Sequence, residues 1–206
     1  MNETKKKPYN LLHITSKANS KKILKDGFIS SKHNLENSKN QWLGDGVYFW
    51  DGNDDEIASF GKNMLKNKYN KNDMVEIYGN IEIQEDRHLN LEIEKNMKSF
   101  CEFVRKVNPN TAEQTLDLLK SLRGELKVNP KQLYQIGKFL GTYINLYIKT
   151  LKDQGYDIDM VSCYFYHGTS KFSFLGRSEK TRRQFCIKNM TLLNSNIRNF
   201  KIYNNF

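Results

Sequence analysis

The chain has 206 residues, of which 33 are Lys or Arg and 23 are Asp or Glu, for a net charge of +10. Its 38% hydrophobic and 12% aromatic content excludes a fully disordered chain, and the length favours a single domain over 1–206 with a real core. No stretch approaches the ~20 apolar residues of a membrane span, no signal peptide is recognisable, and three cysteines cannot form a closed disulfide set. We therefore expect a cytoplasmic protein with reduced thiols and no membrane partner.

The excess positive charge is concentrated near the C-terminus. Residues 160–206 carry eight Lys or Arg against one Asp or Glu. A cationic segment of this kind attracts polyanions such as nucleic acids. An AT-rich genome would produce the same abundance of Lys, Asn and Ile without any functional patch. The composition leaves both explanations open.

The N-terminal part predicts strands alternating with short helices. An apolar run predicts a strand over 9–14, and residues 16–26 predict a helix. Thr15 or Ser16 is its expected N-cap, and Gly27 its expected C-cap. The next expected elements are a polar loop over 30–40, a strand over 47–49, a helix that starts in 51–55 and runs to 65, and a strand over 74–83 with a bulge or turn at Gly79 and Asn80.

The middle of the chain changes character. Three helices are expected over 93–107, 110–123 and 130–154, and the third has the clearest apolar stripe. Strands are again expected over 160–166, 184–188 and 197–203. The sequence therefore predicts an α+β fold with a helical insertion at about 92–154, between two β-rich parts.

The common cofactor motifs are absent from the sequence. There is no dinucleotide-binding glycine fingerprint, no phosphate-binding loop and no nucleophile elbow. No histidine lies in a zinc-protease motif or beside a cysteine at zinc-finger spacing; the histidines are His13, His33, His88 and His167. We therefore expect no metal.

Two stretches nevertheless have the residues of a ligand site. His13 ends an apolar run just before the expected 16–26 helix, and residues 42–50 combine Gly44 and Gly46 with several aromatic side chains. The glycines, Gly46 in particular, would let the backbone approach a bound ligand closely. An imidazole and an adjacent tyrosine ring suit a flat ligand with polar edges, such as nicotinamide. Taken singly, His13 could equally be a structural histidine, and the aromatic strand could be core.

Together the two stretches resemble a known family. The order H-x-T at His13, a helix ending in Gly27 and Phe28, and then L-G-x-G-V-Y-F with Tyr48 resembles the H-Y-E class of ADP-ribosyltransferases, which includes poly-ADP-ribose polymerases and diphtheria-type toxins. His13 and Tyr48 are 35 residues apart, about the separation of that class. The resemblance covers 9–65 well and 155–189 loosely. It implies a split antiparallel β-sheet and NAD as co-substrate.

The resemblance also implies roles for individual residues. His13 would bond the nicotinamide-side ribose, and the Ile14 backbone would hold the carboxamide. Thr15 would lie near the adenine-side ribose, and Tyr48 would stack on the nicotinamide ring. Phe60 lies near the place of a second stacking aromatic, but we expect it to pack in the core, so that stacking is the alternative.

The third motif of the class is altered here. Where the family usually has a glutamate, this sequence has Gln184, as some bacterial members do. Glutamine can accept a hydrogen bond from a ribose hydroxyl but carries no charge, so we expect single transfer rather than chain building. Glu179 is the one carboxylate of the last 47 residues, and it would be either the base for an incoming nucleophile or a solvated loop residue. His167 and Thr169 repeat the first motif, but only 39 residues follow His167, so we expect a turn there.

The loop before the last motif indicates the acceptor. In this class that loop faces the acceptor, and here its cations suit phosphates; they are Arg177, Lys180, Arg182 and Arg183. We therefore expect transfer of ADP-ribose to RNA or single-stranded DNA. The same cations could hold the NAD pyrophosphate or be solvated, and a protein acceptor is the main alternative.

The resemblance implies a toxin or anti-phage effector with an antitoxin partner. Two other functions stay open. One is an NAD-dependent RNA 2′-phosphotransferase, which would require basic residues near His13; Lys17, Lys21 and Lys22 are present there, but the L-G-x-G-V-Y-F stretch argues against it. The other is a non-catalytic basic RNA-binding module.

Overall fold

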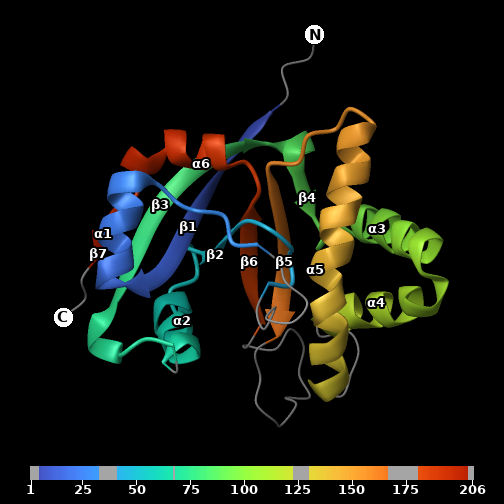
Figure 1. The fold of residues 1–206 in the computed structure, drawn as a ribbon, viewed down its shortest axis with the longest axis horizontal. Coiled ribbons are helices and arrows are strands. Elements are labelled where there is room, and N and C mark those ends of the chain that lie inside the picture. The colour runs from blue at the N-terminus through green and yellow to red at the C-terminus, as the bar shows by residue number, and fades with distance from the viewer. Residues whose placement is uncertain (1–4, 33–40, 67, 123–129, 167–180, 204–206) are drawn as a thin grey trace.

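The computed structural model describes residues 5–32, 41–66, 68–122, 130–166 and 181–203. Over these ranges the chain forms an α+β fold around a seven-stranded sheet in the order β4-β5-β6-β2-β1-β3-β7 (Figure 1). Only the β4–β5 pair is parallel. The α+β class expected from the sequence is confirmed. The strands are β1 (Lys6–Ser16), β2 (Val47–Asp51), β3 (Met74–Gln84), β4 (His88–Asn90), β5 (Met160–Tyr166), β6 (Thr181–Ile187) and β7 (Lys201–Tyr203).

The helices surround this sheet. The three helices expected in the middle of the sequence are present as α3, α4 and α5, and they lie together beside the β4–β5 end of the sheet (Figure 1). None of the helices in the described ranges has the length and apolarity that crossing a bilayer requires. The helices are α1 (Lys17–Asp26), α2 (Ile57–Leu65), α3 (Glu94–Val107), α4 (Pro109–Leu122), α5 (Pro130–Asp153) and α6 (Met190–Ser195), with single turns of 3₁₀ helix at Lys71–Asp73, Glu85–Arg87 and Ile197–Asn199.

Alternation along the strands separates the apolar core into two sides of the sheet. On β6, Phe185 and Ile187 join the cluster beneath α1 and α6, whereas Cys186 joins the cluster that α3–α5 cover. On β1, Leu11 lies in the first of these clusters, and Leu12 lies in a third cluster beneath α2. These two strands therefore bury both faces, which is why helices cover both sides of the sheet there.

The expected interruption of the strand at Gly79 and Asn80 is wrong. β3 pairs with β1 without a break, with Asn80 opposite Asn10 and Gly79 opposite Leu11. A Cβ on Gly79 would lie 2.3 Å from an atom of the Phe200 ring. The glycine is therefore needed for close packing of an aromatic ring and not for a turn.

The sheet is weakly joined between β1 and β2. β1 pairs with β3 through eleven residue pairs along its whole length, but with β2 it pairs only at Leu11↔Asp51 and Leu12↔Trp50. Beyond Leu12 the two strands part. The end of β1, from His13 onward, and the start of β2 therefore form the two walls of a gap within the sheet.

Helix α1 forms between the expected caps. The Ser16 side chain accepts a hydrogen bond from the Asn19 backbone N–H at 3.2 Å, and Gly27, with φ of 88°, donates its N–H to the Ile23 carbonyl at 2.8 Å. The N-cap bond satisfies one of the backbone donors that a helix start leaves unpaired, and glycine tolerates the positive φ at the other end. These caps fix α1 directly after His13.

Part of the charge of α1 opposes the helix's own stability, although Lys25 in the last turn is favourably placed. The helix has no acidic residue in its first turn and begins with Lys17. A cation there faces the positive end of the helix dipole, which is unfavourable by about 0.3–1 kcal/mol. Lys17, Lys21 and Lys25 also follow one another at four-residue spacing, and each such like-charge pair costs about 0.2–0.5 kcal/mol. Stability alone does not explain this arrangement.

A partly buried histidine links β4 and β5, at one end of the sheet, to β1. The Tyr9 hydroxyl lies 2.8 Å from Nδ1 of His88, and His88 Nε2 lies 2.9 Å from the Ser162 hydroxyl. Burial lowers the pKa of His88 to about 3, and the nearby cations Arg183 and Lys7 add to this effect. The imidazole is therefore neutral in the folded protein at ordinary pH.

We expect His88 to make the protein sensitive to mild acid. The unfolded chain binds a proton at His88 near pH 6.5 and the folded chain only near pH 3, so stability falls as the pH drops below about 6.5. Between about pH 6.5 and about pH 5 this amounts to about 2 kcal/mol. Denaturant unfolding at several pH values should show a shallower pH dependence for His88→Gln than for the wild type. Equal slopes would contradict the prediction.

Candidate functional site

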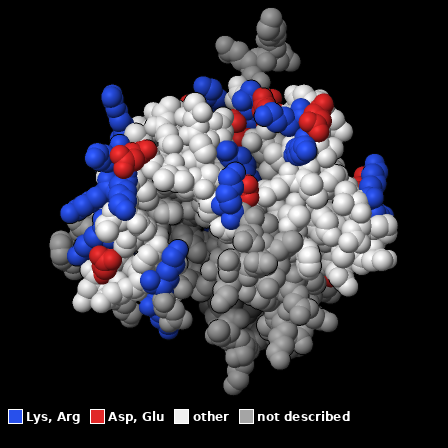
Figure 2. Space-filling model, viewed as in Figure 1, with Lys and Arg blue, Asp and Glu red and all other residues white. Residues whose placement is uncertain are grey.

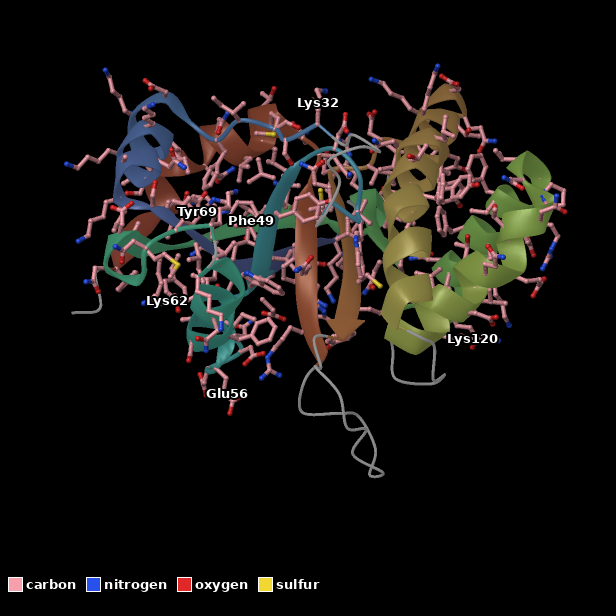
Figure 3. The ribbon with its side chains drawn as sticks, turned by 60° about the horizontal axis from the view of Figure 1, so that its bottom comes forward. Lys32, Phe49, Glu56, Lys62, Tyr69 and Lys120 are labelled. Carbon is pink, nitrogen blue, oxygen red and sulfur yellow. The ribbon has the colours of Figure 1, made fainter. Side chains whose placement is uncertain are left out.

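A hollow of about 800 Å³ lies at the gap between β1 and β2, and its walls come from β1, α1, β2, β6 and the segment after α2. This is the size of a pocket for a small organic ligand or cofactor. Phe49 and Tyr69, which both line it, are labelled in Figure 3. Six of the residues expected from the sequence to form the site also line it, namely His13, Ile14, Thr15, Gly46, Tyr48 and Gln184.

His13 is held as a neutral hydrogen-bond acceptor. Its Nδ1 donates to the backbone carbonyl of Tyr48 at 2.9 Å, because a carbonyl oxygen can only accept. Burial lowers the pKa of His13, and the Lys68 charge adds to this effect. The rings of Phe28 and Phe49 contact the imidazole edge-on, with centroids 5.5 and 5.6 Å away. The Nε2 lone pair, which has no partner among the described residues, can accept a hydrogen bond from a ligand hydroxyl.

The Tyr48 side chain is fixed by two hydrogen bonds of its hydroxyl. Its hydroxyl accepts a hydrogen bond from the Leu43 backbone N–H at 2.9 Å and donates to the Gly44 carbonyl at 2.8 Å. Burial raises the pKa of Tyr48 well above its ordinary value. The phenol is therefore bonded to the turn before β2 and is not an acid. Its ring packs against the core cluster that α3–α5 cover, whereas the His13 imidazole contacts Phe28 and Phe49 of the cluster beneath α1 and α6.

The turn over residues 43–46, which we call the lip, is held in place by hydrogen bonds with Asn145 of α5. The Asn145 side chain accepts a hydrogen bond from the Asp45 backbone N–H at 2.9 Å and donates to the Asp45 carboxylate at 3.1 Å. Gly44 has φ of 79°, and a Cβ there would lie 2.2 Å from Oδ1 of Asn145. The Lys188 ammonium donates to the backbone carbonyls of Leu43 and Asp45. The helical insertion therefore helps to position the lip through Asn145 and through packing of α5 against Leu43 and Tyr48.

Gln184 faces the hollow from β6. Its backbone pairs in register with Trp50, so it lies on the strand beside β2 and on the same face of the sheet as Trp50 and Tyr48. Its side-chain amide has no hydrogen-bond partner within the described ranges. A polar group left in this state at a pocket wall can bond a ligand.

Phe60 is not among the residues that line the hollow. Its ring packs edge-on against Trp50, with centroids 5.5 Å apart, and lies 5.6 Å from the guanidinium carbon of Arg182. This placement matches core packing rather than a stacking role.

Arg182 and Arg183 do not line the hollow either, and both form ion pairs with carboxylates. Arg182 contacts Asp54 at 3.1 Å and Glu56 at 2.7 Å. Arg183 donates through Nε to Glu92 at 2.8 Å and lies 3.6 Å from an Asp51 oxygen. A phosphate would have to compete with these partners for either guanidinium. The other expected acceptor-side residues, Arg177, Glu179 and Lys180, lie outside the described residues, as do His167 and Thr169.

Two lysines at the hollow were missed as site residues by the sequence reasoning. Lys22 of α1 and Lys68, which follows α2, both line it. Lys22 belongs to a helix face that could have been read from its spacing: Asn19, Lys22, Ile23 and Asp26 all line the hollow. Lys68 offers no such pattern, because only the tertiary fold places it near His13.

The site combines aromatic walls, a neutral imidazole acceptor, a side-chain amide, two cations and one carboxylate, Asp26. This combination suits a ligand with flat rings, hydroxyl groups and phosphates. Within the described part of the chain, no three His, Cys, Asp or Glu side chains come together as a metal site would require. Comparison with protein-family models, with curated proteins and with solved structures gives no match for this chain.

Proposed function

We propose that this chain is a mono-ADP-ribosyltransferase that cleaves NAD at the nicotinamide–ribose bond and transfers ADP-ribose to a macromolecule. The observation that carries the proposal is the meeting of His13, Tyr48 and Gln184 at one hollow. These residues come from three motifs that are far apart in the sequence. The gap in the sheet between β1 and β2 agrees with the split sheet that the resemblance implies.

The hollow offers groups for the nicotinamide, the adjacent ribose and the pyrophosphate of NAD. The nicotinamide ring lies against Tyr48, with its carboxamide on the backbone of Ile14. His13 Nε2 accepts a hydrogen bond from the adjacent ribose. Lys22 and Lys68 neutralise the pyrophosphate, whose two charges need cations in a partly buried pocket.

Bond cleavage needs positioning more than acid or base. The glycosidic bond breaks with its electron pair passing to the nicotinamide ring nitrogen, which becomes neutral, while the ribose acquires oxocarbenium character. The Gln184 carbonyl accepts a hydrogen bond from a ribose hydroxyl and orients the sugar. The acceptor then attacks the anomeric carbon, and its proton passes to water. Without a carboxylate at position 184, the site supports one transfer and not chain growth.

For the acceptor we propose single-stranded RNA or DNA, because its unpaired bases can reach a recessed anomeric carbon. The net charge of +10 favours binding to such a polyanion. A role as a toxin or anti-phage effector, with an antitoxin as its partner, rests on the resemblance alone. The lysines of α1 favour one second candidate, an NAD-dependent RNA 2′-phosphotransferase, because they supply basic residues near His13.

The deciding experiment incubates the full chain with adenylate-labelled NAD and separate pools of RNA, single-stranded DNA and protein. We expect nicotinamide release and label in a nucleic-acid pool. Label in the protein pool alone would show a protein acceptor, and loss of phosphate from 2′-phosphorylated RNA would show the second candidate. Absence of nicotinamide release with every pool would overturn the proposal and leave a non-catalytic RNA-binding module.

A matched pair of variants tests Gln184. Gln184→Leu keeps the size of the side chain but removes the acceptor, and we expect about a hundredfold slower nicotinamide release, since hydrogen bonds to the sugar strengthen in the transition state. Gln184→Glu keeps an acceptor and should retain activity. Equal activity of Gln184→Leu and the wild type would remove this residue from the site.

A further inference from the structure

We infer that Lys17, Lys21 and Lys25 of α1, here called the lysine row, bind the phosphodiester backbone of a single-stranded nucleic acid and lead it to the mouth of the hollow. The binding surface is a property of the helix itself. Its purpose, delivery of an acceptor, rests on the proposed function.

The row has the geometry of a backbone-binding surface. Residues four apart lie on one face of a helix, so the three ammonium groups follow one another at intervals of about 6 Å along the axis. All three lysines are exposed, and within the described ranges none of them forms an ion pair. Figure 2 shows Lys and Arg atoms gathered over α1, at the left of the view, with few Asp or Glu atoms between them.

The row also lies next to the hollow. The adjoining face of the same short helix, with Asn19, Lys22 and Asp26, forms part of the wall. A strand held on the row therefore has unpaired bases within reach of the opening. Lys22 stands between the two faces and joins the row to the phosphate-binding part of the pocket.

The lysines of α1 are available to a polyanion, whereas the arginines of β6 are not. From the sequence we expected the acceptor to bind a loop that ends at Arg182 and Arg183, but both arginines are paired with carboxylates. The lysine row has no such competitors among the described residues. A polyanion gains more from unpaired cations, because it releases its own counterions without first breaking an ion pair.

The charge pattern of α1 indicates a role other than stability. A cation at the helix start and two like-charged pairs act against the helix, and the first turn holds no acidic residue to balance them. A surface that binds an anion accounts for all three features.

A single strand fits better than a duplex. A strand with unpaired bases can follow a ten-residue helix while a base turns into the hollow, whereas the bases of a duplex stay stacked inside. RNA and single-stranded DNA share this backbone chemistry, and the experiment separates them.

The test compares two triple variants of the full chain. In one, Lys17, Lys21 and Lys25 are changed to Glu. In the other, three exposed lysines of the helical insertion are changed to Glu, namely Lys95, Lys106 and Lys149. Each Lys→Glu change removes two charges, so both variants go from +10 to +4. Short fluorescent oligonucleotides of RNA, single-stranded DNA and duplex DNA are titrated at several salt concentrations, with polyglutamate as an acidic peptide.

The α1 triple variant should bind single strands at least about tenfold more weakly than the wild type. Its logarithmic salt dependence should be shallower by about 2, as expected for three lost phosphate contacts. The insertion triple variant should bind within about twofold of the wild type. The inference is overturned if the two triple variants lose affinity equally, if the α1 variant loses none, or if the wild type binds duplex or polyglutamate as well as single strands.

The single variant Lys17→Glu separates a role in nucleic-acid binding from a role in helix stability, because it should change the melting temperature and the affinity in opposite directions. A carboxylate at the helix start, four residues before Lys21, should raise the melting temperature by about 2 °C. Affinity for single strands should fall about threefold in the same variant. A fall in both quantities would instead indicate a structural lysine.

Failure of this inference can be told apart from failure of the proposed function. Nicotinamide release without nucleic acid should be unchanged in the α1 triple variant. If that release persists while binding does not depend on the row, the inference falls and the proposed function stands. If the wild type binds through the row but releases no nicotinamide, the surface stands and the proposed function falls.

Discussion

His13→Ala is expected to reduce nicotinamide release from NAD by at least about a hundredfold while the protein remains folded. The variant removes the Nε2 acceptor that would orient the ribose in the transition state. It also removes the bond from Nδ1 to the Tyr48 carbonyl, so some loss of stability accompanies the loss of rate. Steady-state kinetics, together with circular dichroism at the assay temperature, measure the two effects separately.

A ring of similar size provides the control. His13→Phe keeps the aromatic contacts with Phe28 and Phe49 but has no acceptor, so it should be as inactive as His13→Ala. In the wild type the pKa of His13 is lowered by burial, and the rate should show no acid limb near pH 6.5. Full activity of both variants would mean that the imidazole does not touch the substrate.

Asn145→Ala is expected to raise the KM for NAD about tenfold with a smaller change in kcat. Asn145 is a positioning residue. It holds Asp45 with two hydrogen bonds and thereby fixes the lip, whose Gly44 carbonyl accepts a hydrogen bond from the Tyr48 hydroxyl. Their loss leaves the lip free to move, which weakens ligand binding before it affects chemistry. Unfolding should also become easier by about 1–3 kcal/mol.

Two variants on the same helix sharpen this test. Asn145→Asp keeps an acceptor for the Asp45 N–H but brings two carboxylates together, so its KM should rise as well. Lys149→Ala, one turn along α5 and exposed, should leave KM unchanged. If Asn145→Ala lowered stability but not the affinity for NAD, the lip would have no part in binding.

The sequence predicted those parts of the fold that local patterns encode. The caps of α1 at Ser16 and Gly27 and the apolar stripe of α5 are local signals, and both helices are present. β4 and α6 were missed because elements of three and six residues are too short to show a period. The segment expected to be a strand over 197–203 begins as a 3₁₀ turn at Ile197–Asn199, and only Lys201–Tyr203 pairs with β3.

The site was predictable where its residues belong to motifs and not where it depends on the tertiary fold. His13, Tyr48 and Gln184 could be named because each stands in a recognisable stretch, and they line the same hollow. Asn145 could not be named, because it is one polar residue in a helix and only packing brings it to Asp45. Arg182 and Arg183 appeared available in the sequence, but their carboxylate partners come from the 51–56 segment and from Glu92.

The room for a ligand in this protein comes from the backbone. Because β1 and β2 separate after Leu12, the space exists whichever side chains stand along its edges. Substitutions of wall residues can therefore change which ligand binds and still leave the space for a ligand, as long as β1 and β2 do not extend their pairing. One further rung of hydrogen bonds between them would close this space more effectively than any single bulky residue.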